Sequence, residues 1–236
     1  MTLDPAEWTA LLLSLRVAAV SVALMLVPGV ACAWALARTR FRGQAILDTA
    51  IHLPLVLPPV VVGYLLLAGL GRSSWFGGWL HATFGVDIAF TTKAAAIAAA
   101  VMGFPLLVRS TRLAMELVDE RLEDAARTLG ASPWRVFRTI TLPLAIPGVV
   151  TGVVLAFARS LGEFGATIVF AGNIEGRTRT VSTAIYTALQ TPGGDAAAWR
   201  LVLVSVMVSF AALLVSESLA RAARRRLGVA RAGGAS

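Results

Sequence analysis

The stretch DAARTLGASPWRVFRTITLP, residues 124–143, is small, basic and interrupted by turn-forming residues. It lies between segments whose apolar composition suits the interior of a lipid bilayer. Irregular polar backbone is not tolerated against lipid, so this stretch is expected to lie outside the bilayer on one side. The segments around it decide which side that is.

The composition of the chain is that of an integral membrane protein. Of its 236 residues, 57% are hydrophobic and 14% are charged, whereas a soluble domain carries about 25% charged residues. Several apolar runs approach the length of about 20 residues that crosses a bilayer. The net charge of +8 does not indicate nucleic-acid binding, because the arginines cluster in short connections without interleaved aromatic residues. The sequence therefore predicts an all-α protein whose surroundings are membrane lipid.

Hydrophobic runs predict five transmembrane spans, at residues 11–36, 51–70, 91–108, 140–158 and 199–219. The interval 160–198 holds two apolar pieces that are too short to cross alone, so it is predicted as a re-entrant or outer segment. A sixth, irregular crossing in this interval stays open. Residues 1–222 form the membrane domain in this interpretation, and residues 223–236 form a basic tail.

Basic residues are distributed unevenly between the two sides of the predicted spans. Fourteen of the 21 lie in one alternating set of connections, at 38–42, 109–138 and 221–231. The N-terminal segment, on the other side, carries Asp4 and Glu7. Because basic loops tend to stay in the cytoplasm, the N-terminus is predicted outside and the C-terminus inside. Residues 124–143 then face the cytoplasm.

The chain from Asp119 onward is predicted to form two short helices joined by a fixed elbow. Four small or apolar residues recur there at helical spacing and form a narrow edge: Leu122, Ala125, Ala126 and Leu129. Gly130 stands where a helix ends in a left-handed residue, and Ser132 and Pro133 supply the cap and first residue of the next helix. An amphipathic helix of this kind can rest on the bilayer, but alanines at the centre of the edge favour close approach to another protein.

This stretch resembles the EAA loop of bacterial ABC-importer permeases. That loop has the pattern Glu-Ala-Ala, three residues, Gly, nine residues, Ile, one residue, Leu-Pro, and every interval is matched here. The chain departs at one position, where Asp124 replaces the glutamate and Glu123 stands directly before it. The resemblance implies that the loop 113–139 contains coupling helices and docks on a separate cytoplasmic ATPase. The coupling residues that it implies are Glu123, Asp124, Ala125, Ala126, Gly130, Ile140, Leu142 and Pro143.

The sequence carries no motif for chemistry of its own. Its one lysine is Lys93, so the nucleotide-binding pattern G-x-x-x-x-G-K-[S/T] is missing. It also shows no metal-ligand spacing and no catalytic triad, and Cys32 lies alone in an apolar run. The chain is therefore predicted to be a permease subunit and not an enzyme. The resemblance implies that ATP and Mg²⁺ are bound by the partner ATPase and that this chain binds no cofactor.

Two further segments, 54–72 and 159–195, resemble the molybdate-permease branch of this family, which shares its fold with sulfate and thiosulfate permeases. The resemblance implies a multi-pass protein of the bacterial inner membrane that works as a homodimer. Its implied cargo is molybdate or tungstate, delivered by an extracytoplasmic oxyanion-binding protein. Sulfate or thiosulfate is the alternative cargo. A self-sufficient secondary transporter is the alternative class, although neither an internal repeat nor a deep carboxylate supports it.

One glycine-containing segment is the candidate for the cargo pathway and gate: Gly162, Glu163, Phe164, Gly165 and Thr167. Exposed N–H groups and hydroxyls solvate a dianion weakly, which allows it to leave again. Close helix packing explains the glycines equally well. Glu163 would repel a dianion, and with Arg159 four residues earlier it is interpreted as a gate-region or structural pair.

Overall fold

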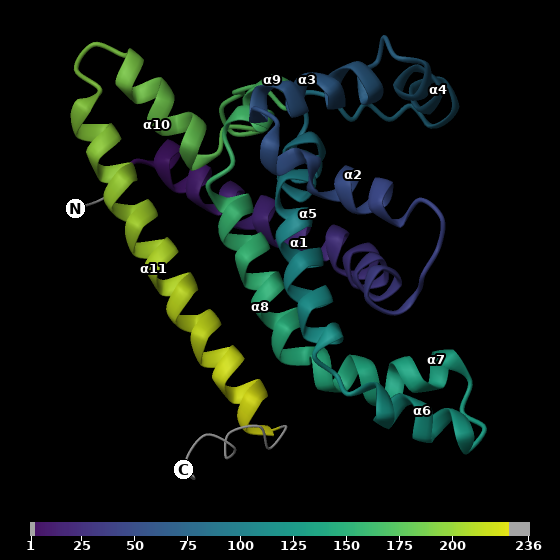
Figure 1. Ribbon diagram of the computed structural model, residues 1–236. Coiled ribbons are helices and arrows are strands. Elements are labelled where there is room, and N and C mark those ends of the chain that lie inside the picture. The colour runs from purple at the N-terminus through teal and green to yellow at the C-terminus, as the bar shows by residue number, and fades with distance from the viewer. Residues whose placement is uncertain (1–2, 227–236) are drawn as a thin grey trace.

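The computed structural model describes residues 3–226, which form helices and no strand (Figure 1). In chain order the elements are α1 (Pro5–Arg38), α2 (Gln44–Val56), α3 (Pro59–Leu70), α4 (Trp75–Phe84), α5 (Thr92–Glu116), α6 (Glu120–Thr128), α7 (Pro133–Val136), the π-helix η1 (Phe137–Thr141), α8 (Leu142–Leu161), α9 (Gly165–Phe170), α10 (Val181–Gln190) and α11 (Asp195–Arg226). The predicted all-α fold is confirmed. Most of the predicted basic tail, residues 227–236, lies outside the described residues.

Four helical segments among the described residues are long and apolar enough to cross a membrane: α1, α5, the run from α7 to α8, and α11 as far as Val215. The pair α2 and α3 makes up a fifth, but it is bent by 117°. The span predicted at 51–70 therefore falls on this bent pair, of which it covers the end of α2 and all of α3. A residue before proline is pushed into extended backbone, and Leu57 and Pro58 have ψ of 142° and 132°.

Helix ends differ from the predicted spans, because hydropathy marks apolar runs and not the residues that end a helix. α5 continues past residue 108 to Glu116, and α11 begins at Asp195 and extends to Arg226. Within the interval 160–198, α9 has 6 residues and α10 has 10. At about 1.5 Å per residue, neither helix is long enough to cross a bilayer.

α5 is the centre of the bundle and packs against both α1 and α8. Its first half presents small buried side chains, among them Ala95 and Ala99, so neighbouring backbones approach closely. Glycine has the same effect on α8, where a Cβ added at Gly148 would lie 2.1 Å from the Cβ of Ala114. Close packing of small residues holds helices together in lipid, where the hydrophobic effect between helices is weak.

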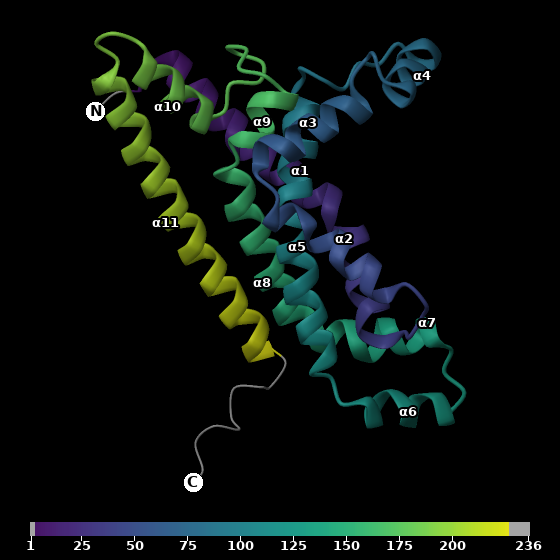
Figure 2. The same cartoon turned by 45° about the horizontal axis from the view of Figure 1, so that its top comes forward.

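The two ends of the bundle are built differently. α6 and α7 lie together at one end, whereas α4, α9 and α10 lie at the other (Figures 1 and 2). α11 stands to one side and contacts α8 and α10. Its first turns are also tied to the start of α1, because the guanidinium of Arg200 pairs with Glu7 (Nη2–Oε1, 2.8 Å). The loop singled out by the sequence thus lies at one end, and the predicted pathway segment at the other.

Candidate functional site

The chain from 119 to 141 folds as a helix elbow, as predicted. Gly130 follows α6 with a φ of +84°, a left-handed conformation that disfavours residues with a Cβ. Ser132 caps α7 by accepting a hydrogen bond from the amide of Arg135 (3.4 Å), and Pro133 occupies the first helical position. The left-handed glycine and the Ser-Pro cap are both confirmed. Backbone geometry therefore fixes the shape of the elbow.

The carboxylate of Glu123 is buried where three segments of the chain meet. Its side chain is 2% exposed. Its Oε1 accepts hydrogen bonds from the hydroxyl of Thr141 (2.7 Å) and from Nε of Arg38 (3.0 Å). Its Oε2 accepts from Nη2 of Arg127 (3.3 Å). One carboxylate therefore joins α6 to the last turn of α1 and to η1, which leads into α8; we call these contacts the Glu123 junction.

The end of α1 holds the elbow through further contacts. Nη2 of Arg38 donates to the carbonyl of Val118, just before α6 (2.8 Å). One turn earlier in α1, the ring of Trp34 lies 5.3 Å from that of Phe137 in η1. Phe137 in turn stacks on Trp134 of α7, also at 5.3 Å. Buried polar groups that all find partners rigidify their surroundings, so α1 and the elbow form one unit.

The apolar edge of α6 points away from the bundle. Leu122 is 50% exposed and Leu129 is 89% exposed, while Ala125 is exposed and Ala126 is half-buried. We call these four residues the α6 edge. A surface helix normally turns its apolar stripe inward and its charges outward, whereas α6 turns Glu123 inward and the edge outward. Apolar surface presented on a rigid helix marks a contact surface for another molecule.

The other implied coupling residues lie beside this edge or along the entry to α8. Asp124, which takes the acidic position of the motif, is 66% exposed and pairs with Arg127 (2.9 Å). The motif position and the buried carboxylate are therefore different side chains. Ile140 and Leu142 are half-buried, and Pro143 lies in the first turn of α8.

Two partners in the Glu123 junction had no sequence signal. Arg38 is 85 positions from Glu123 along the chain, and Thr141 is 18 positions from it. Residues 137–141 also form a π-helix, a rare geometry that frequently accompanies functional sites. Local patterns predict helices and caps, but they do not predict which distant side chain a buried charge meets.

The predicted pathway residues lie together at the junction of α8 and α9. Gly162 ends α8 and is exposed. Gly165 packs on α3, because a Cβ added there would lie 2.7 Å from the Cβ of Pro59. Phe164 is half-buried and Thr167 is buried. Close packing is thus the structural reason for glycine at 165, whereas Gly162 leaves its backbone accessible.

Glu163 is buried at this junction with its charge compensated. It is 3% exposed, and its Oε1 accepts a hydrogen bond from the amide of Ala166 in the first turn of α9 (2.8 Å). Its Oε2 lies 2.5 Å from Nη1 of Arg159 in α8. The pair holds α9 against the end of α8, which favours the structural interpretation over a direct contact with cargo.

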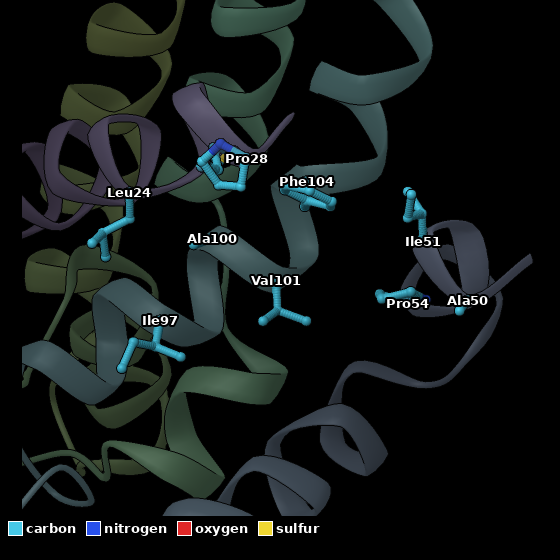
Figure 3. A pocket seen from close by; sticks show the side chains of 10 residues that line it. Leu24, Pro28, Ala50, Ile51, Pro54, Ile97, Ala100, Val101 and Phe104 are labelled. Carbon is cyan, nitrogen blue, oxygen red and sulfur yellow. The ribbon is translucent and has the colours of Figure 1, made fainter. Parts of the chain in front are cut away.

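An apolar groove of about 500 Å³ lies between α1, α2 and α5. Figure 3 shows its lining, which includes Pro28, Pro54 and Phe104 from these three helices, and all ten lining side chains are apolar. This lining offers an anion no side-chain hydrogen-bond donor in place of water, which disfavours anion binding in the groove. Nor do the described residues bring three His, Cys, Asp or Glu side chains together to hold a metal ion.

Comparison with known proteins agrees with this architecture. Residues 26–228 match the family described as binding-protein-dependent transport system inner membrane component. The chain is 57% identical over 228 residues to the molybdenum transport system permease protein ModB of Escherichia coli K12, covering 97% of this chain and 100% of that protein. It is 38% identical over 185 residues to the sulfate transport system permease protein CysT of the same organism, covering 77% of this chain and 66% of that protein.

A solved structure with a similar fold is the MetNI methionine ABC transporter in an inward-facing conformation. The TM-score is 0.72, and the match covers 94% of this chain and 99% of that chain. At 17% identity this likeness shows the fold alone. The family match, by contrast, covers most of the sequence. The chain therefore belongs to the binding-protein-dependent transport system inner membrane components, the permeases of ABC importers.

Proposed function

We propose that this chain is the membrane-spanning subunit of an ATP-driven importer whose cargo is molybdate or tungstate. The observation that carries the proposal is the 57% identity to a molybdenum permease over 97% of the chain. The sulfate permease is a more distant relative, at 38% identity over 77% of the chain. Molybdate is therefore favoured, and sulfate or thiosulfate is the second candidate cargo.

A separate cytoplasmic ATPase dimer binds ATP and Mg²⁺ and drives transport, while this chain binds no cofactor. The α6 edge supports this assignment, because it holds Leu122 and Leu129 exposed on a rigid elbow. Complete burial of one such leucine against a partner contributes about 1.5–3 kcal/mol. The chain has no nucleotide-binding motif with which to hydrolyse ATP itself.

The Glu123 junction transmits movement of the docked ATPase into the membrane. A displacement of α6 reaches α8 through Thr141 and α1 through Arg38, by direct hydrogen bonds. Both α1 and α8 pack on α5, so the centre of the bundle responds as well. Packed elements of this kind shift as rigid bodies between discrete arrangements. Through the junction, a displacement of α6 therefore changes how the transmembrane helices pack against one another.

The α6–α7 end faces the cytoplasm, and the end with α4, α9 and α10 faces outward. This orientation puts the N-terminus outside and the C-terminus inside, and the arginine asymmetry of the connections supports it. An extracytoplasmic oxyanion-binding protein delivers cargo to the outer end. A second copy of the chain completes the pathway by two-fold symmetry, because about five spans are too few to enclose a polar passage.

Cargo passes beside the α8–α9 junction, residues 162–167. The backbone of Gly162 is exposed there at a break between helices. The negative charge of Glu163 is compensated by Arg159, so it repels a passing dianion only weakly. Weak contacts with backbone N–H groups and hydroxyls permit exit as well as entry.

Reconstitution tests the function and the cargo together. Proteoliposomes containing this chain, its ATPase and its binding protein are supplied with labelled molybdate, tungstate or sulfate. The expected result is ATP-dependent uptake of molybdate and tungstate, with sulfate taken up much more slowly. Uptake of sulfate without molybdate would establish the second candidate, and uptake without any ATPase would contradict the proposed class.

A further inference from the structure

α4 stands apart from the rest of the bundle in both views (Figures 1 and 2). It follows α3 after the four residues 71–74, and it packs chiefly against the end of that helix. Both of its ends are fixed. Ser74 caps it by accepting a hydrogen bond from the amide of Gly77 (2.9 Å), and Gly85 ends it with a φ of +64°. α4 is thus a well-formed helix with little support from the remaining chain.

Aromatic side chains cover one face of α4. Trp75 is 86% exposed, Phe76 is 42% exposed and Trp79 is 49% exposed. At 3.6 residues per turn, these three positions fall within about 100° of the helix circumference. The ring of Trp79 lies 5.9 Å from that of Phe76 and 5.9 Å from that of Phe84, which is 63% exposed. We call these four residues the α4 aromatic face.

The side of α4 opposite these rings carries one polar residue, His81, which is tied to the flanking chain. His81 projects from that side, and its Nε2 lies 2.8 Å from Nη2 of Arg72. Its Nδ1 lies 3.0 Å from Oδ1 of Asp87. Arg72 precedes the helix and Asp87 follows it, so His81 joins the two segments that flank α4 to each other. Exposed tryptophan rings are typical of a segment that lies at the interface between lipid and water.

We propose that α4 lies in the surface of the bilayer, with the α4 aromatic face among the lipid headgroups and upper acyl chains. Tryptophan favours this depth, because its ring is apolar and its N–H is a hydrogen-bond donor. The preceding helix also exposes large side chains, since Tyr64 and Leu65 of α3 are 63% and 56% exposed. α4 itself carries no Asp, Glu, Lys or Arg.

A protein partner fits this surface less well than lipid. In the function proposed above, the binding protein sits over the pathway segment near α9, whereas α4 extends away from α9 and α10 in both views. The contacts of α4 with its neighbours indicate what its position in the bilayer surface would do. α4 holds the outer end of α3 at a fixed depth, and α3 packs on α9 beside the α8–α9 junction. The bent pair α2–α3 thereby keeps its position while the elbow moves at the other end.

Accessibility of nitroxide labels in lipid vesicles tests the proposal. Single cysteines replace Trp75 or Trp79 in the full chain, in a Cys32→Ser background. Leu129→Cys is the matched control, because this apolar residue is exposed to nearly the same degree, 89% against 86% for Trp75, at the opposite end. Labels at 75 and 79 are expected to relax mainly with oxygen, which concentrates in lipid. The label at 129 is expected to relax mainly with a water-soluble nickel chelate.

The oxyanion-binding protein is added in a second arm and is expected to leave the labels at 75 and 79 unchanged. A response dominated by the nickel chelate at both positions would overturn the proposal. Protection of these labels only after the binding protein is added would also overturn it, and would identify α4 as a docking face for that protein. Neither outcome depends on the cargo, so failure here is distinguishable from failure of the uptake experiment.

Discussion

Replacement of Glu123 by alanine is expected to abolish ATP-driven uptake while the ATPase still binds and hydrolyses ATP. The change removes the nearer counter-charge of Arg38, which is 8% exposed and keeps only a longer contact with the exposed Glu120 (3.6 Å). Removal of one partner from a buried ion pair costs about 3–5 kcal/mol. The hydroxyl of Thr141 loses its acceptor as well. α6 can then still dock through its exposed edge, but its movement no longer reaches α1 and α8. Uptake and ATP hydrolysis, measured in the same proteoliposomes, check this uncoupling.

Asp124→Ala is the matched control for this prediction. It removes the neighbouring carboxylate, which is 66% exposed and pairs with Arg127. An exposed pair of this kind contributes at most about 1 kcal/mol, so uptake is expected to stay near the original level. Glu123→Gln, which keeps a hydrogen-bond acceptor, is expected to retain more uptake than Glu123→Ala. Loss of uptake in Asp124→Ala with uptake retained in Glu123→Ala would show that the motif position governs coupling and the buried junction does not.

Replacement of Leu129 by aspartate is expected to prevent association with the ATPase. The side chain is 89% exposed, so the change removes little packing within the chain, which should fold and insert normally. In the complex, the same side chain would have to bury a charge in an apolar contact. A central contact residue contributes about 2 kcal/mol or more, which corresponds to affinity weaker by about 30-fold. Titration of the ATPase against the purified chain measures the loss.

Leu189→Asp is the control for Leu129→Asp, because it makes the same chemical change at an exposed position of α10 (63%) at the other end of the bundle. ATPase affinity should be unchanged in this variant. A Leu129→Asp chain that bound the ATPase with unchanged affinity would remove the α6 edge from the docking surface. Addition of Leu122→Asp to Leu129→Asp is expected to weaken the association further.

The elbow was predictable from the sequence, because its determinants are local. A left-handed Gly130 and a Ser132-Pro133 cap need only neighbouring residues to act. The break between α2 and α3 also had a local cause, the Pro58-Pro59 pair. A hydropathy pattern averages over such a pair and reports one span where the backbone turns by 117°.

The Glu123 junction was not predictable in the same way. Spacing placed Leu122 and Leu129 on one edge of α6, but spacing does not say whether that edge faces inward or outward. The direction is set by Glu123, whose partner Arg38 is 85 positions away along the chain. The motif drew attention to Asp124 and to Glu123 directly before it, but it does not say that Glu123 is the buried carboxylate. Only tertiary packing distinguishes these two acidic residues.

The contact between the α6 edge and the ATPase is tested most directly by cross-linking in assembled membranes. Leu129→Cys and Leu122→Cys, each in a Cys32→Ser background, are treated with a short thiol-to-amine reagent, and Trp75→Cys serves as the control at the opposite end. The expected result is a covalent adduct between this chain and the ATPase from positions 129 and 122 and none from position 75. An adduct from position 75, or no adduct from positions 129 and 122 when the ATPase copurifies with the chain, would contradict it.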